Sequence, residues 1–429
     1  MLLEKIFKLS AHNTNVKKEV RAGITTFLAM AYIVPVNASI MSLTGMPFDA
    51  LITATAVVTI IATILNGLWA NTPIAMSVGM GLNAYFTFGL VKGMGIPWQS
   101  ALGIVMISGL IFLILSFTKF RVWVLNSVPI DLRRAISAGI GLFIAFIGLQ
   151  GMGFIVKNDA TLVTLGDLSN IKVLLGIFGF FIAAYLYSKK VKGAFLISIL
   201  LTSIIAWISG AYKLPQSIFS MPASLAPIAF KFDILSALKL SLIPVIITFL
   251  ITDMFDTIGT LAGIGLRANL FKDDTKELQR TLEADAAATV IGASLGTSTT
   301  TSFIESAAGV EEGGRTGLTA VVCGLMFLTT LFFLPVFKAI PPSAIYAILV
   351  MVGVLMFSEI KNINFKDSVV LISAFLTIFL MPLTYSITLG LSAGFVAYFL
   401  LALIRGEKEK INFQIAILAL IGLGGFIFH

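Results

Sequence analysis

The amino-acid sequence predicts an all-α polytopic membrane protein. Hydrophobic residues make up 58% of the 429 residues and charged residues only 12%, whereas soluble globular chains carry about 25% charged residues. Apolar runs long enough to cross a bilayer, which takes about 20 residues each, recur along the whole length. No hydrophilic block is large enough to form a separate soluble domain. We therefore predict a single membrane domain over residues 1–429.

The apolar runs divide the chain into fourteen predicted spans. They cover residues 18–41, 48–69, 72–90, 98–118, 133–155, 171–187, 193–211, 236–264, 282–296, 300–311, 316–337, 342–358, 367–383 and 385–404. A further apolar tail, 411–429, fits either a fifteenth span or a helix in the membrane interface.

The basic residues predict the orientation of the chain. Lys and Arg gather in the N-terminal segment and in the loops that follow even-numbered spans. The seven exceptions are Lys92, Lys157, Lys172, Lys213, Lys231, Lys239 and Lys338. Cytoplasmic loops carry an excess of Lys and Arg, so we predict a multi-pass protein of the cytoplasmic membrane with its N-terminus in the cytoplasm. The net charge of +8 follows from this topology and does not indicate binding to nucleic acid.

Weak internal similarity relates the two halves of the chain. ITTFLAMAYI at 24–33 resembles IITFLITDMF at 246–255, an offset of 222 residues. The same offset places Asn83 of GMGLNAYF on Glu305 of SFIESAAG. Chance similarity between apolar helices is the alternative explanation.

A further match extends the similarity into the later spans. VPIDLRRAISAGIGL near 128–142 resembles IPPSAIYAILVMVGV near 340–354, at an offset of 212 residues. Membrane transporters often contain inverted repeats, and an odd number of spans in each half makes the halves run oppositely across the bilayer. We predict two inverted seven-span repeats, at about 18–211 and 236–404.

The third span of each half, spans 3 and 10, is short and rich in Gly, Ser and Thr. Their sequences are NTPIAMSVGMGLNAYF and GASLGTSTTTSFIESAAG. Because Gly costs about 1 kcal/mol relative to Ala in a helix interior, we predict a short extended segment followed by a half-helix in each. Irregular backbone at membrane depth must line a cavity or be buried in protein. Glu305 falls at the start of the second half-helix.

Four acidic residues lie inside predicted spans. Asp253 and Asp256 share a face of span 8, with Thr260 one turn further on, Asp285 lies in span 9, and Glu305 lies in span 10. A charged group at the bilayer centre costs roughly 2.5–3.5 kcal/mol, so each is expected to face a cavity or a partner. For Asp256 and Glu305 we favour a functional role. For Asp253 and Asp285 a structural role, such as capping a helix, is an equal alternative.

The sequence lacks the residues that several kinds of enzyme chemistry require. The sequence has no phosphate-binding loop of the form G-x-x-x-x-G-K-[ST]. The two histidines, His12 and His429, are terminal, so neither a metal-ligand cluster nor a Ser-His-Asp triad is expected in the spans. We predict a transporter without cofactor or metal rather than an enzyme.

The remaining polar groups suit a small, flat, neutral ligand. Carboxylates accept hydrogen bonds, and protonated carboxyl groups also donate one. Burial disfavours the charged form of a carboxylate, so such a site can also hold a proton. The residues themselves therefore predict a proton-coupled carrier of a small polar solute.

The motifs resemble those of the nucleobase:cation symporter-2 family. The resemblance is to its purine permease branch, which carries adenine, guanine and hypoxanthine and is related to uracil and xanthine permeases. The stretches that carry it are TTFLAMAYIVPVN, GMGLNAYF, FDTIGT and RTLEADAAATVIGASLGTSTTTSFIESAAGVEEGGRTGL, and it covers the chain to about residue 404. It implies purine uptake by proton symport, with sodium as an alternative coupling ion, and it allows a homodimer. It also implies a core domain of spans 1–4 and 8–11 and a gate domain of spans 5–7 and 12–14.

The resemblance assigns roles to the acids. In the related uracil permeases one acid of span 8 and one of span 10 hold the base, and these positions correspond to Asp256 and Glu305. Thr260 stands where those relatives have a His, and together with Asp in place of Glu this favours the purine branch. We assign proton coupling to Asp256, Glu305 and Asp253.

The resemblance also implies contacts from the two broken spans. Backbone groups near Asn83 and Ala84, and from Ser302 through Phe303 to Ile304, are expected to hydrogen-bond the base. Phe303 is a candidate for stacking on its ring, with a position in the apolar core as the alternative.

Other functions remain as alternatives. An anion carrier or channel of the same fold needs positive charge at the midplane, and no Lys or Arg lies near the broken segments in the sequence. A carrier of another nucleobase, such as xanthine or uracil, needs only a different pocket shape. A purely structural scaffold does not explain acids beside broken helices.

Overall fold

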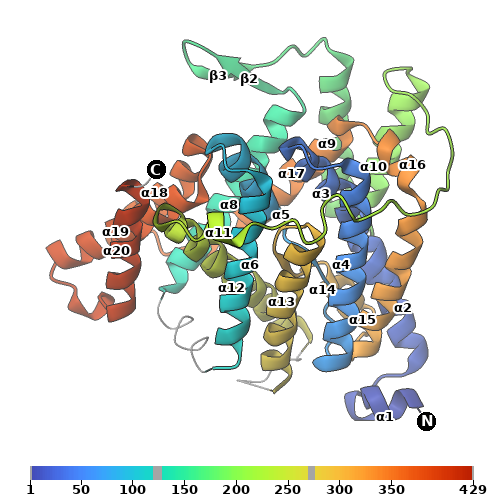
Figure 1. Cartoon of the computed structure of the whole chain (residues 1–429), viewed down its shortest axis with the longest axis horizontal. Coiled ribbons are helices and arrows are strands. Elements are labelled where there is room, and N and C mark those ends of the chain that lie inside the picture. The colour runs from blue at the N-terminus through green and yellow to red at the C-terminus, as the bar shows by residue number, and fades with distance from the viewer. Residues whose placement is uncertain (1, 119–127, 269–275, 428–429) are drawn as a thin grey trace.

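A computed structural model of the chain describes residues 2–118, 128–268 and 276–427, and this part is mostly helical (Figure 1). Among the described residues, eight segments are long and apolar enough to cross a membrane: Val16–Thr44, Phe48–Trp69, Trp98–Ser116, Ile130–Gly151, Ile171–Ser188, Leu240–Gly265, Pro342–Asn362 and Ile387–Ile404. Shorter apolar helices lie at Ala194–Ile208, Gly317–Phe332, Ser368–Thr384 and Phe413–Gly424. The predicted helical, polytopic class is confirmed, and the number fourteen stays a prediction.

The bounds of the elements are as follows. The first half contains α1 (Leu2–Phe7), α2 (Val16–Met30), α3 (Ile33–Met41), α4 (Phe48–Trp69), β1 (Met76–Val78), α5 (Met80–Ala84), a π-helical segment (Tyr85–Gly93), α6 (Trp98–Ser116), α8 (Ile130–Gly151), β2 (Ile155–Asn158), β3 (Leu162–Leu165), α9 (Ile171–Ser188) and α10 (Ala194–Ile208). The second half contains α11 (Ile234–Ala237), α12 (Ile243–Ala268), α13 (Lys276–Leu295), β4 (Thr300–Ser302), α14 (Ser306–Glu311), α15 (Gly317–Phe327), α16 (Leu334–Ala339), α17 (Pro342–Phe357), α18 (Ser368–Thr384), α19 (Ile387–Ile404) and α20 (Phe413–Ile427). Turns of 3₁₀ helix lie at Ser10–His12, Ser42–Thr44, Leu240–Leu242, Leu328–Phe332, Ser358–Asn362 and Lys408–Lys410.

The helices pack in two groups. In one group α4 packs against α13 and α15, α15 packs against α2, and α13 packs against α6. In the other group α8 packs against α17 and α18, α17 against α9, and α19 against α18 and α20. In Figure 1 the C-terminal helices α18–α20 lie at the left of the molecule, and α2 and α15 lie at its right.

Two glycines allow a close helix crossing within the second group. A Cβ added at Gly141 of α8 would lie 2.6 Å from the carbonyl oxygen of Gly353 of α17, and one added at Gly353 would lie 2.4 Å from that of Gly141. Real Cβ atoms do not approach a carbonyl oxygen so closely, so both positions require glycine for α8 and α17 to pack at this distance.

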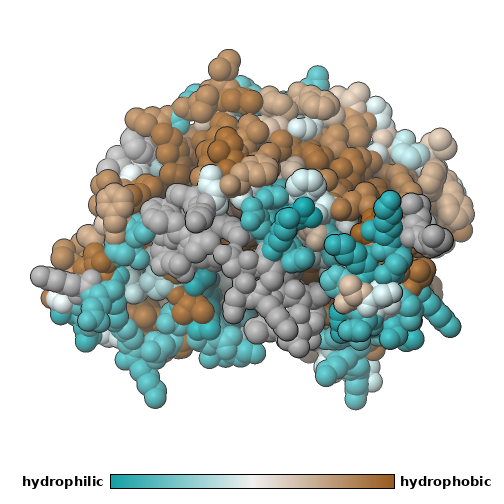
Figure 2. Space-filling view, turned by 90° about the horizontal axis from the view of Figure 1, so that it is seen from below, coloured by the Kyte–Doolittle hydropathy of each residue, from teal (hydrophilic) through white to brown (hydrophobic). Residues whose placement is uncertain are grey.

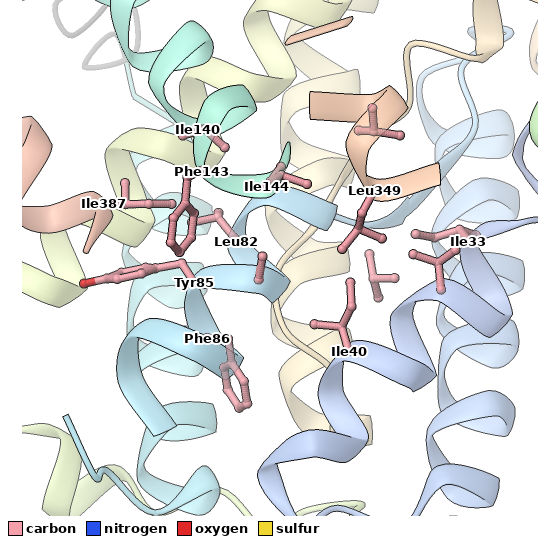
Figure 3. Packing of buried hydrophobic residues seen from close by; sticks show 14 of the residues in the cluster. Ile33, Ile40, Leu82, Tyr85, Phe86, Ile140, Phe143, Ile144, Leu349 and Ile387 are labelled. Atoms are coloured by element: carbon pink, nitrogen blue, oxygen red, sulfur yellow. The ribbon is translucent and has the colours of Figure 1, made fainter. Parts of the chain in front are cut away.

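A continuous apolar core joins the two groups of helices (Figure 3). It contains side chains of α3, of α5 with the π-helical segment, and of α8, α17 and α19. The residues labelled in Figure 3 are Ile33, Ile40, Leu82, Tyr85, Phe86, Ile140, Phe143, Ile144, Leu349 and Ile387. The half-helix of span 3 is thus buried in protein, as irregular backbone at membrane depth must be.

The outer surface is strongly apolar. Only 28% of the apolar window of α9 is buried inside the protein, and Phe181 and Ile208 are exposed large side chains of this region. In the view of Figure 2, seen from below, hydrophilic side chains gather mostly in the lower part of the picture and hydrophobic side chains cover much of its upper part. An apolar surface of this extent is suited to lipid rather than to water.

Two small two-stranded sheets accompany the helices in the described part of the chain, and the hairpin of β2 and β3 was not predicted. β1 pairs with β4, and β2 pairs with β3 in a hairpin. The hairpin follows α8, which ends at Gly151 although the predicted span 5 ran over 133–155. Asn158 closes its turn by accepting hydrogen bonds from the backbone N–H groups of Ala160 and Thr161, an arrangement that favours a turn over helix.

Spans 8 and 11 are also interrupted where the sequence predicts continuous helices. α12 begins at Ile243, after the separate α11, because Pro244 fits the first turn of a helix, where its missing N–H is not needed. α15 ends at Phe327 and continues as 3₁₀ helix, where the hydroxyl groups of Thr329 and Thr330 donate to preceding carbonyl oxygens. The apolar tail forms α20, which packs on α19, and its residues 428–429 lie outside the described residues.

Candidate functional site

The two broken spans meet as a short antiparallel ribbon. Met76 of β1 pairs with Ser302 of β4, and Val78 pairs with Thr300. Because the strands are antiparallel, α5 and α14 leave the ribbon from opposite ends. A strand followed by a short helix is thus present in both segments for which the sequence predicts an extended piece and a half-helix.

Two buried threonines bond the outer edges of this ribbon. Thr63 of α4 donates to the carbonyl oxygen of Met76 at 2.8 Å and accepts from its N–H at 3.0 Å. Thr289 of α13 does the same for Thr300, at 2.9 and 3.1 Å. Each hydroxyl group therefore replaces a neighbouring strand, and the polar backbone stays hydrogen-bonded inside the apolar protein.

Glu305 is the N-cap residue of α14 and is half-buried. The hydroxyl group of Tyr32 donates to its Oε1 at 2.5 Å. Tyr32 lies between α2 and α3, is fully buried, and packs edge-on against Phe195 of α10 with ring centroids 5.2 Å apart. The sequence analysis assigned no role to Tyr32, although the residue lies in the stretch TTFLAMAYIVPVN.

Asp256 of α12 is half-buried, and its carboxyl group interacts electrostatically with that of Glu305. Within the described residues its carboxyl group has no hydrogen-bond donor and no ion-pair partner. Thr260, one turn further along α12, is buried. The structure therefore brings Asp256 and Glu305 together and leaves hydrogen-bonding capacity on both, because Tyr32 contacts only one oxygen of Glu305.

The residues of the first broken span are engaged with protein. The Asn83 side chain donates to Asn37 at 2.5 Å, Asn37 donates to Thr55 at 2.7 Å, and the Asn83 backbone N–H donates to the carbonyl oxygen of Gly79. Ala84 is fully buried in the apolar core. Hydrogen-bond donors of this half-helix that remain for a ligand belong to its first turn, ahead of Asn83.

The residues of the second broken span differ in accessibility. Ser302 donates to Asp285 at 3.1 Å. Phe303 is buried in the main apolar core, and its N–H donates to the carbonyl oxygen of Ala75. Ile304 is 54% exposed, and within the described part of the chain its N–H donates to no partner. Ile304 and Glu305 are therefore the positions of this segment that a ligand can reach.

Asp253 and Asp285 lie next to this site, between α12 and α13. Thr257 donates to Asp285 at 2.6 Å, and the hydroxyl group of Thr289 lies 3.0 Å from Oδ2 of Asp253. Within the described residues none of the four intramembrane acids has a basic partner, and no group of three or more acidic, His or Cys side chains is arranged to hold a metal ion.

Comparison with known proteins identifies the family. The model of the Permease family (Xan_ur_permease) matches residues 17–422, nearly the whole chain. The chain belongs to this permease family. It is therefore a membrane transporter rather than an enzyme.

Relatives of the chain share its full length. It is 39% identical to the adenine permease AdeP of Escherichia coli (strain K12), over 100% of this chain and 96% of the relative. It is 40% identical to the guanine/hypoxanthine permease PbuG of Bacillus subtilis (strain 168), over 96% of each chain.

Solved structures with the same fold are more distant in sequence. The transmembrane domain of the cyanobacterial bicarbonate transporter BicA superposes with a TM-score of 0.67 at 16% identity, covering 86% of this chain and 97% of that chain. SLC26A9 superposes with a TM-score of 0.65 at 12% identity, covering 91% and 66%. These likenesses establish the fold alone.

Proposed function

We propose that this permease takes up purine nucleobases, such as adenine, guanine and hypoxanthine, across the cytoplasmic membrane by proton symport. The observation that carries the proposal is the pair Asp256 and Glu305, which lie together, half-buried, without a basic partner among the described residues. Full-length relatives named as adenine and guanine/hypoxanthine permeases support the choice of substrate.

The proposed site binds the base through its N–H groups. The free oxygen of Glu305 accepts one N–H donor, and Asp256 accepts a second when ionised or donates to a ring nitrogen when protonated. The backbone N–H of Ile304, which has no partner among the described residues, supplies a donor for another ring nitrogen or a carbonyl oxygen. Proton coupling is assigned to the acids Asp256, Glu305 and Asp253.

We propose further that fourteen spans form two inverted repeats, with a core and a gate domain. The two packing groups of helices match the predicted division into spans 1–4 with 8–11 and spans 5–7 with 12–14. Gly141 and Gly353, which meet at the crossing of α8 and α17, differ by 212 residues, the offset found in the sequence for this part of the repeat. Thr63 and Thr289 bond β1 and β4 in the same way, as expected of equivalent positions.

The orientation, with a cytoplasmic N-terminus, rests on the distribution of Lys and Arg. Some of these basic residues fall within 119–127 and 269–275, which lie outside the described residues.

An anion carrier is the main alternative, because BicA has the same fold and carries bicarbonate. Arg133 of α8 lies over the ring of Phe255 at 5.9 Å, on the residue next to Asp256 in α12. However, two carboxyl groups at the proposed site repel an anion, and the described structure gives neither of them a basic partner. The carboxyl pair therefore favours a neutral ligand with N–H donors.

Binding of radiolabelled bases to the purified protein tests the proposal. Adenine, guanine and hypoxanthine should bind and compete with one another, whereas bicarbonate and sulfate should not displace them. Xanthine and uracil in the same competition series test the alternative nucleobases. Saturable binding of bicarbonate, with no binding of any purine, would show that the anion reading is correct.

A further inference from the structure

A second carboxyl pair lies beside the two acids assigned to the base. Asp253 of α12 is 1% exposed and Asp285 of α13 is 0% exposed. The two side chains interact electrostatically, and both also interact with Asp256. These acids are more deeply buried than Asp256 and Glu305, so a nucleobase at the half-buried pair would not cover them directly.

The two carboxyl groups differ in how many of their oxygens have a hydrogen-bond partner. Asp285 accepts from Ser302 on Oδ1 at 3.1 Å and from Thr257 on Oδ2 at 2.6 Å. Oδ2 of Asp253 lies 3.0 Å from the hydroxyl group of Thr289, whereas its buried Oδ1 has no hydrogen-bond partner among the described residues. A buried, unpartnered carboxylate oxygen is costly unless a cation or a proton occupies it.

The bonding of Thr289 also points to a proton on Asp253. A hydroxyl group has one proton to donate, and Thr289 faces two acceptors, Asp253 Oδ2 at 3.0 Å and the carbonyl oxygen of Thr300 at 2.9 Å. When Thr289 donates to the β4 backbone, its contact with Asp253 is satisfied only if the carboxyl group is protonated and donates. A protonated Asp253 therefore lets β4 keep its edge hydrogen bond.

The surrounding charges do not neutralise two carboxylates. The charged groups that interact with the pair are Asp256, on α12, and through it Glu305 at the start of α14, and both are acidic. The nearby cation on α8, Arg133, lies over Phe255 rather than against either carboxyl group of the pair. Like charges sharing a buried site disfavour double ionisation. Among the described residues no group of three or more acidic, His or Cys side chains is arranged to hold a metal ion, so a single proton on the pair fits better.

We propose that Asp253 and Asp285 hold one exchangeable proton between them, and that this proton is the ion carried with the base. The inference rests on the proposed function and moves the coupling role from Asp256 and Glu305 to Asp253 and Asp285, a pair that does not itself bind the base. The proton enters as the free ion, protonates one carboxylate of the pair, and returns to water when the carboxyl group ionises after translocation. No other bond is made or broken.

The pair is linked to the base site through two elements. Thr257, a donor to Asp285, directly follows Asp256 in α12, and Ser302, the other donor, lies three residues before Glu305. A base bound between Asp256 and Glu305 therefore contacts the segments that carry the hydrogen bonds of Asp285. Base occupancy and protonation of the pair can thus affect each other without direct contact, and such coupling is reciprocal.

The test is co-transport of protons by the full-length protein in vesicles that contain a pH-sensitive dye. Asp253→Asn keeps the shape of the side chain but cannot exchange a proton. We expect wild type to carry one proton with each base, whereas Asp253→Asn should exchange external for internal base without carrying protons. Asp159→Asn, in the exposed turn between β2 and β3, is the matched control and should co-transport as wild type does. A wild-type proton-to-base ratio in Asp253→Asn would overturn the inference.

Calorimetry of the wild-type protein keeps the inference testable if Asp253→Asn does not fold. Base binding is titrated in two buffers of different ionisation enthalpy, and the difference gives the protons taken up per base. If the protein takes up a proton when the base binds, the result supports the shared-proton pair. If base binding changes the number of bound protons at no pH from acid to alkaline, the inference is overturned. Absence of purine binding in wild type would refute the proposed function itself. Purine uptake with unaltered coupling in Asp253→Asn would refute only the inference.

Discussion

Replacing Glu305 by Gln tests the base-binding site most sharply among single substitutions. Glu305 presents two oxygens, of which Oε1 accepts from Tyr32 at 2.5 Å and Oε2 is assigned to the N–H of the base. Gln keeps the size and shape of the side chain. If its oxygen stays on Tyr32, its NH₂ group faces the donor of the base, and if it flips, the remaining acceptor is uncharged.

Either orientation loses a charge-assisted hydrogen bond. Hydrogen bonds to charged groups contribute about 1.5–3 kcal/mol, so the dissociation constant of the base should rise by roughly 10- to 100-fold. The double variant Glu305→Gln/Tyr32→Phe should lose less binding free energy for the base than the sum of the two single variants, because both substitutions remove parts of one hydrogen-bonded unit.

Binding calorimetry with adenine and with guanine measures these effects. Glu359→Gln is the matched control, because Glu359 lies in the 3₁₀ turn Ser358–Asn362 after α17, and within the described residues its carboxylate accepts from Asn362 alone. The control should bind as wild type does. Wild-type affinity in Glu305→Gln, with the protein folded, would show that Glu305 does not contact the base.

Three further predictions follow from the described contacts. Tyr32→Phe should weaken base binding by about 2- to 13-fold, the net effect of one hydrogen bond at about 0.5–1.5 kcal/mol, with ring packing on Phe195 retained, and binding calorimetry will measure it. Asp256→Asn should lower the affinity for base but leave the proton-to-base ratio of the residual uptake unchanged, in contrast to Asp253→Asn, and unaltered affinity would remove Asp256 from the site. Gly141→Ala should destabilise the protein by about 1–3 kcal/mol through overpacking, seen as a lower melting temperature in detergent. Gly424→Ala in α20, where an added Cβ meets nothing within 4 Å, should leave that temperature unchanged.

Local composition was sufficient to predict where the helices break. The run of Gly, Ser and Thr before Glu305 disfavours continuous helix, and the structure has β4 followed by α14 there. In the same way, the position of Glu305 at a helix start follows from its place after that run. Interruptions caused by Pro244 and by the threonines after α15 were readable in principle from the same chemistry, but the apolar pattern across them predicted single helices.

Contacts between distant parts of the chain could not be predicted from composition. Tyr32 and Glu305 are 273 residues apart, and nothing in the apolar run around Tyr32 shows which polar group its hydroxyl will meet. Thr63 and Thr289 likewise look like ordinary threonines in apolar helices until the ribbon of β1 and β4 is placed between them. For Asp253 and Asp285, only the structure shows that the two acids share one buried cluster.

Uptake into vesicles tests the central claim, purine–proton symport, most directly. The purified protein is reconstituted, a proton gradient is imposed without a sodium gradient, and accumulation of radiolabelled adenine, guanine and hypoxanthine is followed. The account predicts that at least one of these bases accumulates above its external concentration and that a protonophore abolishes this accumulation. Accumulation of bicarbonate or sulfate but no purine, or full purine uptake driven by sodium alone and insensitive to the protonophore, would contradict it.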